Sequence, residues 1–201
     1  MLIPDGSAVF ELIVKKSRFI ASAEYIESPE DARILVKKRK GEHPDASHVV
    51  HAFISGDDRQ YMGMSDDGEP SGTSGKPVLE VLKGGGNTNV IITVVRYFGG
   101  TKLGTGGLVK AYSGAAAGVM DRLKTKPLVK YRKFHLKTNY HDYQLLKALI
   151  EESGCLIEDE SFGTAIDITG QVPEGSAEAL ENSLIDASSG RAEVCLSGEI
   201  G

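Results

Sequence analysis

Apolar residues recur along the first two thirds of the chain with the periods that distinguish strands from helices. The expected order is strand, strand, helix, strand, helix, strand, helix, with strands over residues 9–14, 19–26, 48–54 and 90–95 and helices over residues 29–41, 77–83 and 105–123. Ser28 and Pro29 have the residue types that cap and begin a helix. Residues 90–95 are apolar at every position but one, which predicts a central strand covered on both faces.

The last third of the chain has a different and equally regular order. It predicts a strand, a helix, two strands, a helix and a strand, over residues 131–139, 142–153, 155–159, 165–171, 176–189 and 192–196. This β-α-β-β-α-β order is that of the ferredoxin-like fold. Residues 125–130, which include Pro127, are expected to be a linker. The chain is therefore predicted to be an α+β protein with domains over residues 1–126 and 131–201.

Charge divides the chain at nearly the same place. The net charge is −5, which argues against a protein that coats DNA. Residues 1–130 hold 18 Lys and Arg against 15 Asp and Glu, whereas residues 131–201 hold 5 against 13. The first domain has a net charge of +3 and is expected to be able to bind a polyanion. The second has a net charge of −8 and is not.

The remaining composition indicates an ordinary intracellular protein. Cys155 and Cys195 are far apart in sequence and form no metal-binding motif, so we expect both to be reduced core residues. The start of the chain lacks the pattern of a signal peptide, and residues 90–95 are too few to span a bilayer. We expect a cytoplasmic location, no membrane partner and no cofactor.

A glycine-rich segment follows the predicted central strand and leads into the next helix. Consecutive glycine amides before a helix N-terminus can hold a phosphate or carboxylate, and nearby cations would add charge. The residues expected to bind such a ligand or nucleic acid are Arg96, Tyr97, Gly99, Gly100, Lys102, Gly104, Gly106, Gly107 and Lys110. The segment is not a Walker A loop, because Thr105 stands at the lysine position. The alternative is that the glycines only permit a tight turn.

An acidic loop is the second candidate. It comprises Asp66, Asp67, Gly68, Glu69, Pro70, Ser71, Gly72 and Thr73. Three carboxylates in four residues could bind a hard cation, but the spacing is not that of an EF-hand, so we expect no metal. Asp67 and Glu69 are the candidates for a catalytic base. The alternative is a loop whose residue types serve only a turn and the following helix start.

Hydroxyl chemistry has weaker support in the sequence. Ser71, Thr73 and Ser74 lie in or beside the acidic loop, and His48 or His51 could approach them, but the sequence contains no nucleophile elbow. The two histidines are three residues apart on a predicted strand. Their side chains should therefore point to opposite faces of the sheet and cannot share one ligand.

These segments together resemble the signature of the YigZ/IMPACT family. The resemblance rests on residues 66–73, 96–100 and 103–112, with residues 16–19 and His48 also fitting. Ser74 departs from the alanine common in the family. The resemblance implies a first domain like domain 2 of ribosomal protein S5. It implies a ferredoxin-like second domain similar to domain V of elongation factor G.

Three functions remain open. The resemblance implies a protein that modulates translation, since eukaryotic IMPACT proteins are translational regulators. Its expected partners are RNA, the ribosome or a translation-related protein, with Tyr97 or Phe98 available for base stacking. The second possibility is an enzyme acting on a small phosphorylated or carboxylated substrate, with Asp67 or Glu69 as general base. The third is a protein-interaction module whose conspicuous loops are structural.

Overall fold

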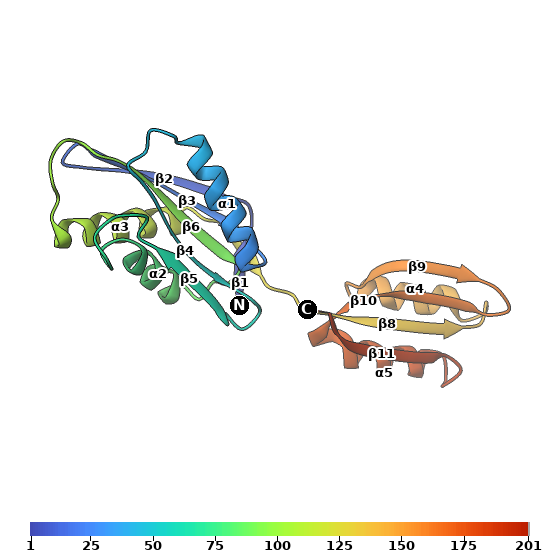
Figure 1. Ribbon diagram of the computed structural model, residues 1–201. Helices are drawn as coiled ribbons and strands as arrows, with labels where there is room; N and C mark the ends of the chain where they lie inside the picture. The colour runs from blue at the N-terminus through green and yellow to red at the C-terminus, as the bar shows by residue number, and fades with distance from the viewer. Residues whose placement is uncertain (201) are drawn as a thin grey trace. The chain divides into compact units, whose positions relative to one another are not determined.

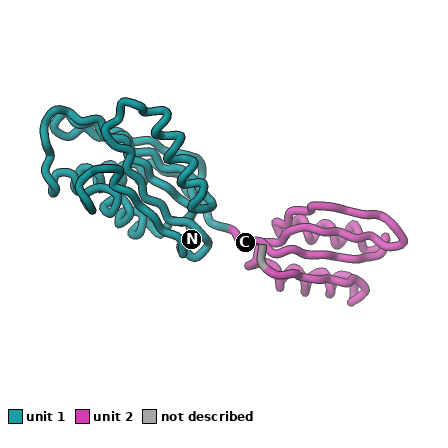
Figure 2. Tube along the Cα trace, viewed as in Figure 1, with its two compact units in different colours: residues 1–128 teal, residues 129–201 magenta. Residues whose placement is uncertain are grey.

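The computed structural model describes residues 1–200. The chain forms two compact units, Met1–Leu128 and a second unit from Val129 onward (Figure 2). Each unit has its own apolar core. No helix within residues 1–200 is long and apolar enough to cross a membrane.

The first unit is built on a five-stranded antiparallel sheet (Figure 1). Its strand order is β2-β3-β6-β4-β5. The strands are β2 (Ala8–Val14), β3 (Ser17–Tyr25), β4 (His48–Ser55), β5 (Tyr61–Ser65) and β6 (Val90–Tyr97). Three helices connect them: α1 (Pro29–Glu42), α2 (Gly75–Gly84) and α3 (Thr105–Met120).

Helices cover the two faces of this sheet unequally. Val90, Ile92 and Val94 of β6 pack into the core formed with α2 and α3. Ile91 points to the opposite face and packs against Ala32 of α1. The prediction that β6 is a central strand buried on both sides is therefore confirmed.

The start of α1 follows its sequence signals. Ser28 accepts a hydrogen bond from the Asp31 backbone N–H, and the Asp31 carboxylate accepts one from the Ser28 backbone N–H. Pro29 occupies the first turn, as predicted. The hydroxyl and two backbone N–H groups that contact Asp31 hold the pKa of its carboxyl below the usual value.

Three short strands were not expected from the sequence. β1 (Leu2–Pro4) pairs with β7 (Thr125–Pro127), so part of the predicted linker is a strand of the first unit. β5 has the sequence Tyr-Met-Gly-Met-Ser, which contains no β-branched residue and so gives little strand signal. β5 forms because the edge of β4 is free to pair with it.

The second unit is a four-stranded antiparallel sheet with the order β11-β8-β10-β9. Its elements are β8 (Tyr131–Thr138), α4 (Tyr143–Glu152), β9 (Leu156–Phe162), β10 (Ile166–Pro173), α5 (Ala177–Ala187) and β11 (Glu193–Ile200), with a short 3₁₀ helix over Glu174–Ser176. This topology is ferredoxin-like, and the α+β class is confirmed. The similarity to domain V of elongation factor G stays a prediction.

The cysteines correct one expectation. Both are free, as predicted, but Cys195 is exposed and Cys155 only half-buried. Neighbouring Val194 and Leu196 are the β11 residues that pack against the core. Cys195 alternates with them along the strand and so faces away from the core.

Candidate anion-binding site

A cavity of about 550 Å³ lies at one end of the first unit's sheet. Four segments form it: the residues that begin β4, the acidic loop (residues 66–73), the end of β6, and the glycine loop (residues 98–104) with the start of α3. Its lining residues are Ser47, His48, Glu69, Pro70, Arg96, Phe98, Lys102, Leu103, Gly104, Thr105 and Leu108. The family-like motifs therefore meet in one cavity although they are separated along the chain.

A buried ion pair forms the floor of this cavity. Arg96 Nη1 donates to Glu69 Oε1 over 2.6 Å, and the Tyr112 hydroxyl donates to the same oxygen over 2.7 Å. The side chains of Glu69 and Arg96 are only 3% and 7% exposed. Burial, and then the neighbouring Glu69 carboxylate, raise the pKa of Tyr112 far above the usual value, so this phenol stays a hydrogen-bond donor. The network joins the acidic loop, β6 and α3 at one oxygen atom.

Arg96 retains hydrogen-bonding capacity beyond this pair. Its guanidinium lies 5.5 Å from the ring centroid of Phe19 and 5.6 Å from that of Phe98. Its Nε is buried and has no hydrogen-bond partner among the described residues. Seven other buried side-chain atoms of the described residues also have no partner, so the property draws attention to Arg96 only because this residue lines the cavity.

His48 presents one ring nitrogen to the cavity. Its Nδ1 lies 2.8 Å from the backbone carbonyl oxygen of Asp67. A carbonyl can only accept, so Nδ1 carries a hydrogen, and in the neutral imidazole Nε2 holds the lone pair. Nε2 lies 3.8 Å from Glu69 Oε2. His51 lies on the opposite face of the sheet, as predicted, and burial lowers the pKa of its imidazole.

The N-terminus of α3 adds a positive pole. Gly104 precedes the helix with a φ of 74°, and no side chain caps the helix. No acidic residue lies in its first turn, and the exposed Lys102 lines the cavity beside it. Uncapped N–H groups and the helix dipole favour an anion at such a place.

The acidic loop owes its shape to its own carboxylates. Asp66 accepts hydrogen bonds from the backbone N–H groups of Gly72, Ser74 and Gly75 and from the Ser74 hydroxyl. Burial raises the pKa of Asp66, but these four donors outweigh it, so the pKa lies below the usual value. Asp67 accepts from the Val49 backbone N–H and from Lys40.

These bonds bear on the chemistry considered for the loop. In the described part of the chain, no group of three or more His, Cys, Asp and Glu side chains could hold a metal ion. The Thr73 hydroxyl donates to the Pro70 carbonyl, and the Ser74 hydroxyl to Asp66, so both have structural partners. Asp67 does not line the cavity, and Glu69 is the one candidate base that does.

The glycines of the glycine loop and of the start of α3 differ in how far the fold constrains them. A Cβ on Gly99 would lie 2.1–2.3 Å from backbone atoms of Lys16 and Ser17, so this glycine allows two chain segments to pack together. Gly100 and Gly104 have positive φ values of 81° and 74°. Gly106 has neither constraint, because a Cβ there would meet nothing within 4 Å. The turn interpretation therefore explains Gly99, Gly100 and Gly104 but not Gly106.

Of the nine predicted binding residues, Arg96, Lys102 and Gly104 line the cavity, and Tyr97 and Lys110 are among those that do not. Arg96 and Tyr97 are consecutive on β6, so their side chains point to opposite faces. Tyr97 Oη lies 2.8 Å from His43 Nδ1, at the end of α1. Lys110 is exposed on α3 and is not among the cavity residues. Phe98, in contrast, lines the cavity and is 50% exposed.

Two contributors to the site were not predicted. In the sequence Tyr112 belongs to an apolar helix stripe, but a tyrosine hydroxyl in a core requires a partner, and this requirement is a usable signal. Ser47 precedes β4 and accepts a hydrogen bond from the Phe98 backbone N–H. No sequence feature marks Ser47.

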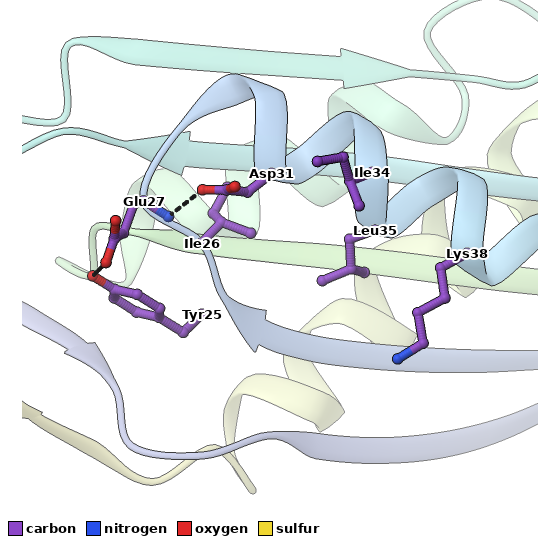
Figure 3. A pocket seen from close by; sticks show the side chains of 7 residues that line it. All are labelled: Tyr25, Ile26, Glu27, Asp31, Ile34, Leu35 and Lys38. Atoms are coloured by element: carbon purple, nitrogen blue, oxygen red, sulfur yellow. Dashed lines mark hydrogen bonds between the residues drawn. The ribbon is translucent and has the colours of Figure 1, made fainter.

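A second hollow, of about 400 Å³, lies beside α1 on the other face of the sheet (Figure 3). It is lined by Tyr25, Ile26, Glu27, Asp31, Ile34, Leu35 and Lys38. Its polar groups satisfy one another: the Tyr25 hydroxyl donates to Glu27, and the Glu27 backbone N–H donates to Asp31. It contains no residue of the predicted motifs and carries two carboxylates against one lysine, so it is not an anion site.

The fold and the first cavity define the class of protein. It is a two-unit α+β chain in which separate glycine-rich and acidic motifs converge on one cavity. A family model described as the Impact N-terminal domain matches residues 15–120, and one described as a domain of unknown function (DUF1949) matches residues 136–191. The chain belongs to the IMPACT family, which confirms the resemblance seen in its sequence.

Relatives match over nearly the whole chain. An IMPACT family member of Haemophilus influenzae is 39% identical over 192 residues, covering 94% of this chain and 93% of that protein. IMPACT family member YigZ of Escherichia coli is 36% identical over 191 residues, covering 94% of each. A crystal structure of a hypothetical protein, 35% identical, aligns with a TM-score of 0.72 and covers 99% of this chain and 98% of its own.

Proposed function

We propose that this protein binds RNA or ribosomes and modulates translation, with RNA phosphate held at the cavity of the first unit. The observation that carries the proposal is the uncapped N-terminus of α3 beside the buried Arg96, whose Nε has no partner among the described residues. The helix N-terminus favours an anion from the solvent, and the guanidinium of Arg96 adds positive charge to the cavity lining.

The charges around the cavity support a polyanion. Lys15 and Lys16 are exposed on the β2–β3 turn, whose backbone contacts Gly99, and Lys102 is exposed on the glycine loop. The carboxylates of Asp66, Asp67 and Glu69 are each bonded to donors of the protein. These carboxylates therefore repel an approaching phosphate less than free ones would.

The cavity also offers a surface for a base. Phe98 is half exposed at the rim, and an aromatic ring in a basic site stacks on nucleobases with little dependence on sequence. The family resemblance supports the proposed role in translation, because it implies a likeness to eukaryotic IMPACT proteins, which are translational regulators.

A lysine pair tests the proposal. Lys102→Ala is expected to weaken binding to ribosomal subunits and to bulk cellular RNA and to reduce the salt dependence by about one phosphate contact. Lys110→Ala is the matched control, because Lys110 is also exposed but lies outside the cavity lining, and it should bind like wild type. The measurement is affinity across a salt series. Absence of binding by the wild-type protein would refute the proposal.

A second candidate function is an enzyme acting on a small phosphorylated or carboxylated substrate. It is favoured by one observation, the Oε2 atom of Glu69 beside the Nε2 atom of His48 in a cavity of small-molecule size. Glu69 is then the candidate base, because both oxygens of Asp67 are bonded to Val49 and Lys40. Screening phosphorylated and carboxylated metabolites for turnover lost in Glu69→Gln tests it, and no turnover of any of them counts against it.

A further inference from the structure

Two atoms that line the cavity, one oxygen of Glu69 and one ring nitrogen of His48, have no hydrogen-bond donor among residues 1–200. Glu69 Oε1 accepts from both Arg96 and Tyr112, which fixes the carboxylate and leaves Oε2 without a donor among the described residues. In the neutral imidazole of His48, Nε2 is likewise an acceptor, because Nδ1 donates to the Asp67 carbonyl. The two atoms are 3.8 Å apart, and two acceptors cannot bond to each other.

This acceptor pair matches a ligand with two neighbouring donors. A vicinal diol has two adjacent hydroxyl groups, each with one hydrogen to donate. Acidic side chains bind ribose hydroxyls in this way in dinucleotide-binding proteins, and the 2′-hydroxyl is the group by which proteins distinguish RNA from DNA. DNA lacks the 2′-hydroxyl and would leave one of the two acceptors without a hydrogen bond.

The rest of the cavity matches the remaining parts of one nucleotide. The α3 N-terminus and Lys102 form the anion pole, and Phe98 offers a stacking surface. A volume of about 550 Å³ is within the range of small-ligand cavities and far too small for a duplex.

We infer that the cavity binds a ribonucleoside 5′-phosphate unit with a free 2′,3′-diol, the chemistry found at the 3′ end of RNA and in free ribonucleotides. The diol donates to His48 Nε2 and Glu69 Oε2, and the phosphate binds at the start of α3. This inference rests on the proposed function for its RNA source and specifies which part of the RNA enters the site.

The test compares ligands that differ only at the terminal ribose. A short single-stranded RNA with a 3′-hydroxyl end is measured beside the same RNA with a 2′-deoxy terminal residue and with a 3′-phosphate. We expect both changes to weaken binding about tenfold or more, the usual effect of losing a hydrogen bond to a charged group. Adenosine 5′-monophosphate and its 2′-deoxy form make the same comparison for the free nucleotide.

Glu69→Gln is the diagnostic variant, since it keeps the shape of the side chain and changes its acceptor capacity. It should lose the preference for the diol, so that the ribose and 2′-deoxyribose ends bind to this variant with equal affinity. His48→Gln, on a different element, should lose the same preference, so the test does not depend on one variant folding.

The outcomes separate the two proposals. Equal binding of the ribose and deoxyribose ends by the wild-type protein would overturn the diol inference and leave RNA binding intact. Diol-dependent binding of the free nucleotide alone would support the inference and contradict the RNA function. Absence of binding to every one of these ligands would overturn both.

Discussion

Glu69→Ala is expected to lower the free energy of unfolding of the first unit by about 3–5 kcal/mol, the usual cost of removing one partner of a buried ion pair. The variant leaves the guanidinium of Arg96 buried without its counter-charge and removes the acceptor of the Tyr112 hydroxyl. Denaturant unfolding followed by circular dichroism measures the change.

Two further variants control this prediction. Glu80→Ala removes an exposed glutamate whose partner, Lys83, is also exposed, so it should change stability by less than about 1 kcal/mol. Replacing Glu69 and Arg96 together by leucine should cost less than Glu69→Ala, because no buried charge is then left unpaired. Equal losses of unfolding free energy in Glu69→Ala and Glu80→Ala would show that the buried ion pair stabilises the fold no more than an exposed one.

Gly99→Ala is the second substitution with a large expected effect. Its Cβ would lie 2.1–2.3 Å from the carbonyl carbon and oxygen of Lys16 and the amide nitrogen of Ser17. Backbone atoms cannot rotate away, so the glycine loop must separate from the β2–β3 turn. We expect the free energy of unfolding to fall by about 1–3 kcal/mol or more, as it does when extra atoms are forced into a packed core. A lower melting temperature measures this loss.

Gly106→Ala is the matched control for this glycine. Gly106 is helical, and a methyl group added there would have no atom within 4 Å. Alanine is the better helix former, so stability should stay the same or rise by up to about 1 kcal/mol. Equal melting temperatures for the two variants would mean that the close approach at Gly99 does not constrain the fold.

Much of the fold could be predicted from local sequence patterns. The unbroken apolar run of β6, the Ser28 cap of α1 and the element order of the second unit each depend on residues close in sequence. β5 could not be predicted, because its sequence has little strand propensity and its pairing with β4 depends on the tertiary structure.

The site was only partly predictable, for a related reason. Its motifs were recognisable as segments, but segments do not specify which side chains converge. Glu69 bonds to Arg96 and Tyr112, which lie 27 and 43 residues further along the sequence. The separation of Tyr97 from Arg96, in contrast, follows from strand alternation, the same argument that correctly separated His48 from His51.

The two carboxylate oxygens of Glu69, which lines the cavity, differ in their hydrogen bonds. Oε1 joins three elements of the first unit, while Oε2 has no donor among the described residues. A ligand that supplies this donor binds the native state alone, so it raises the melting temperature by an amount that grows with its affinity and concentration. Thermal denaturation in the presence of candidate compounds therefore detects a ligand of the native protein whatever its chemical class.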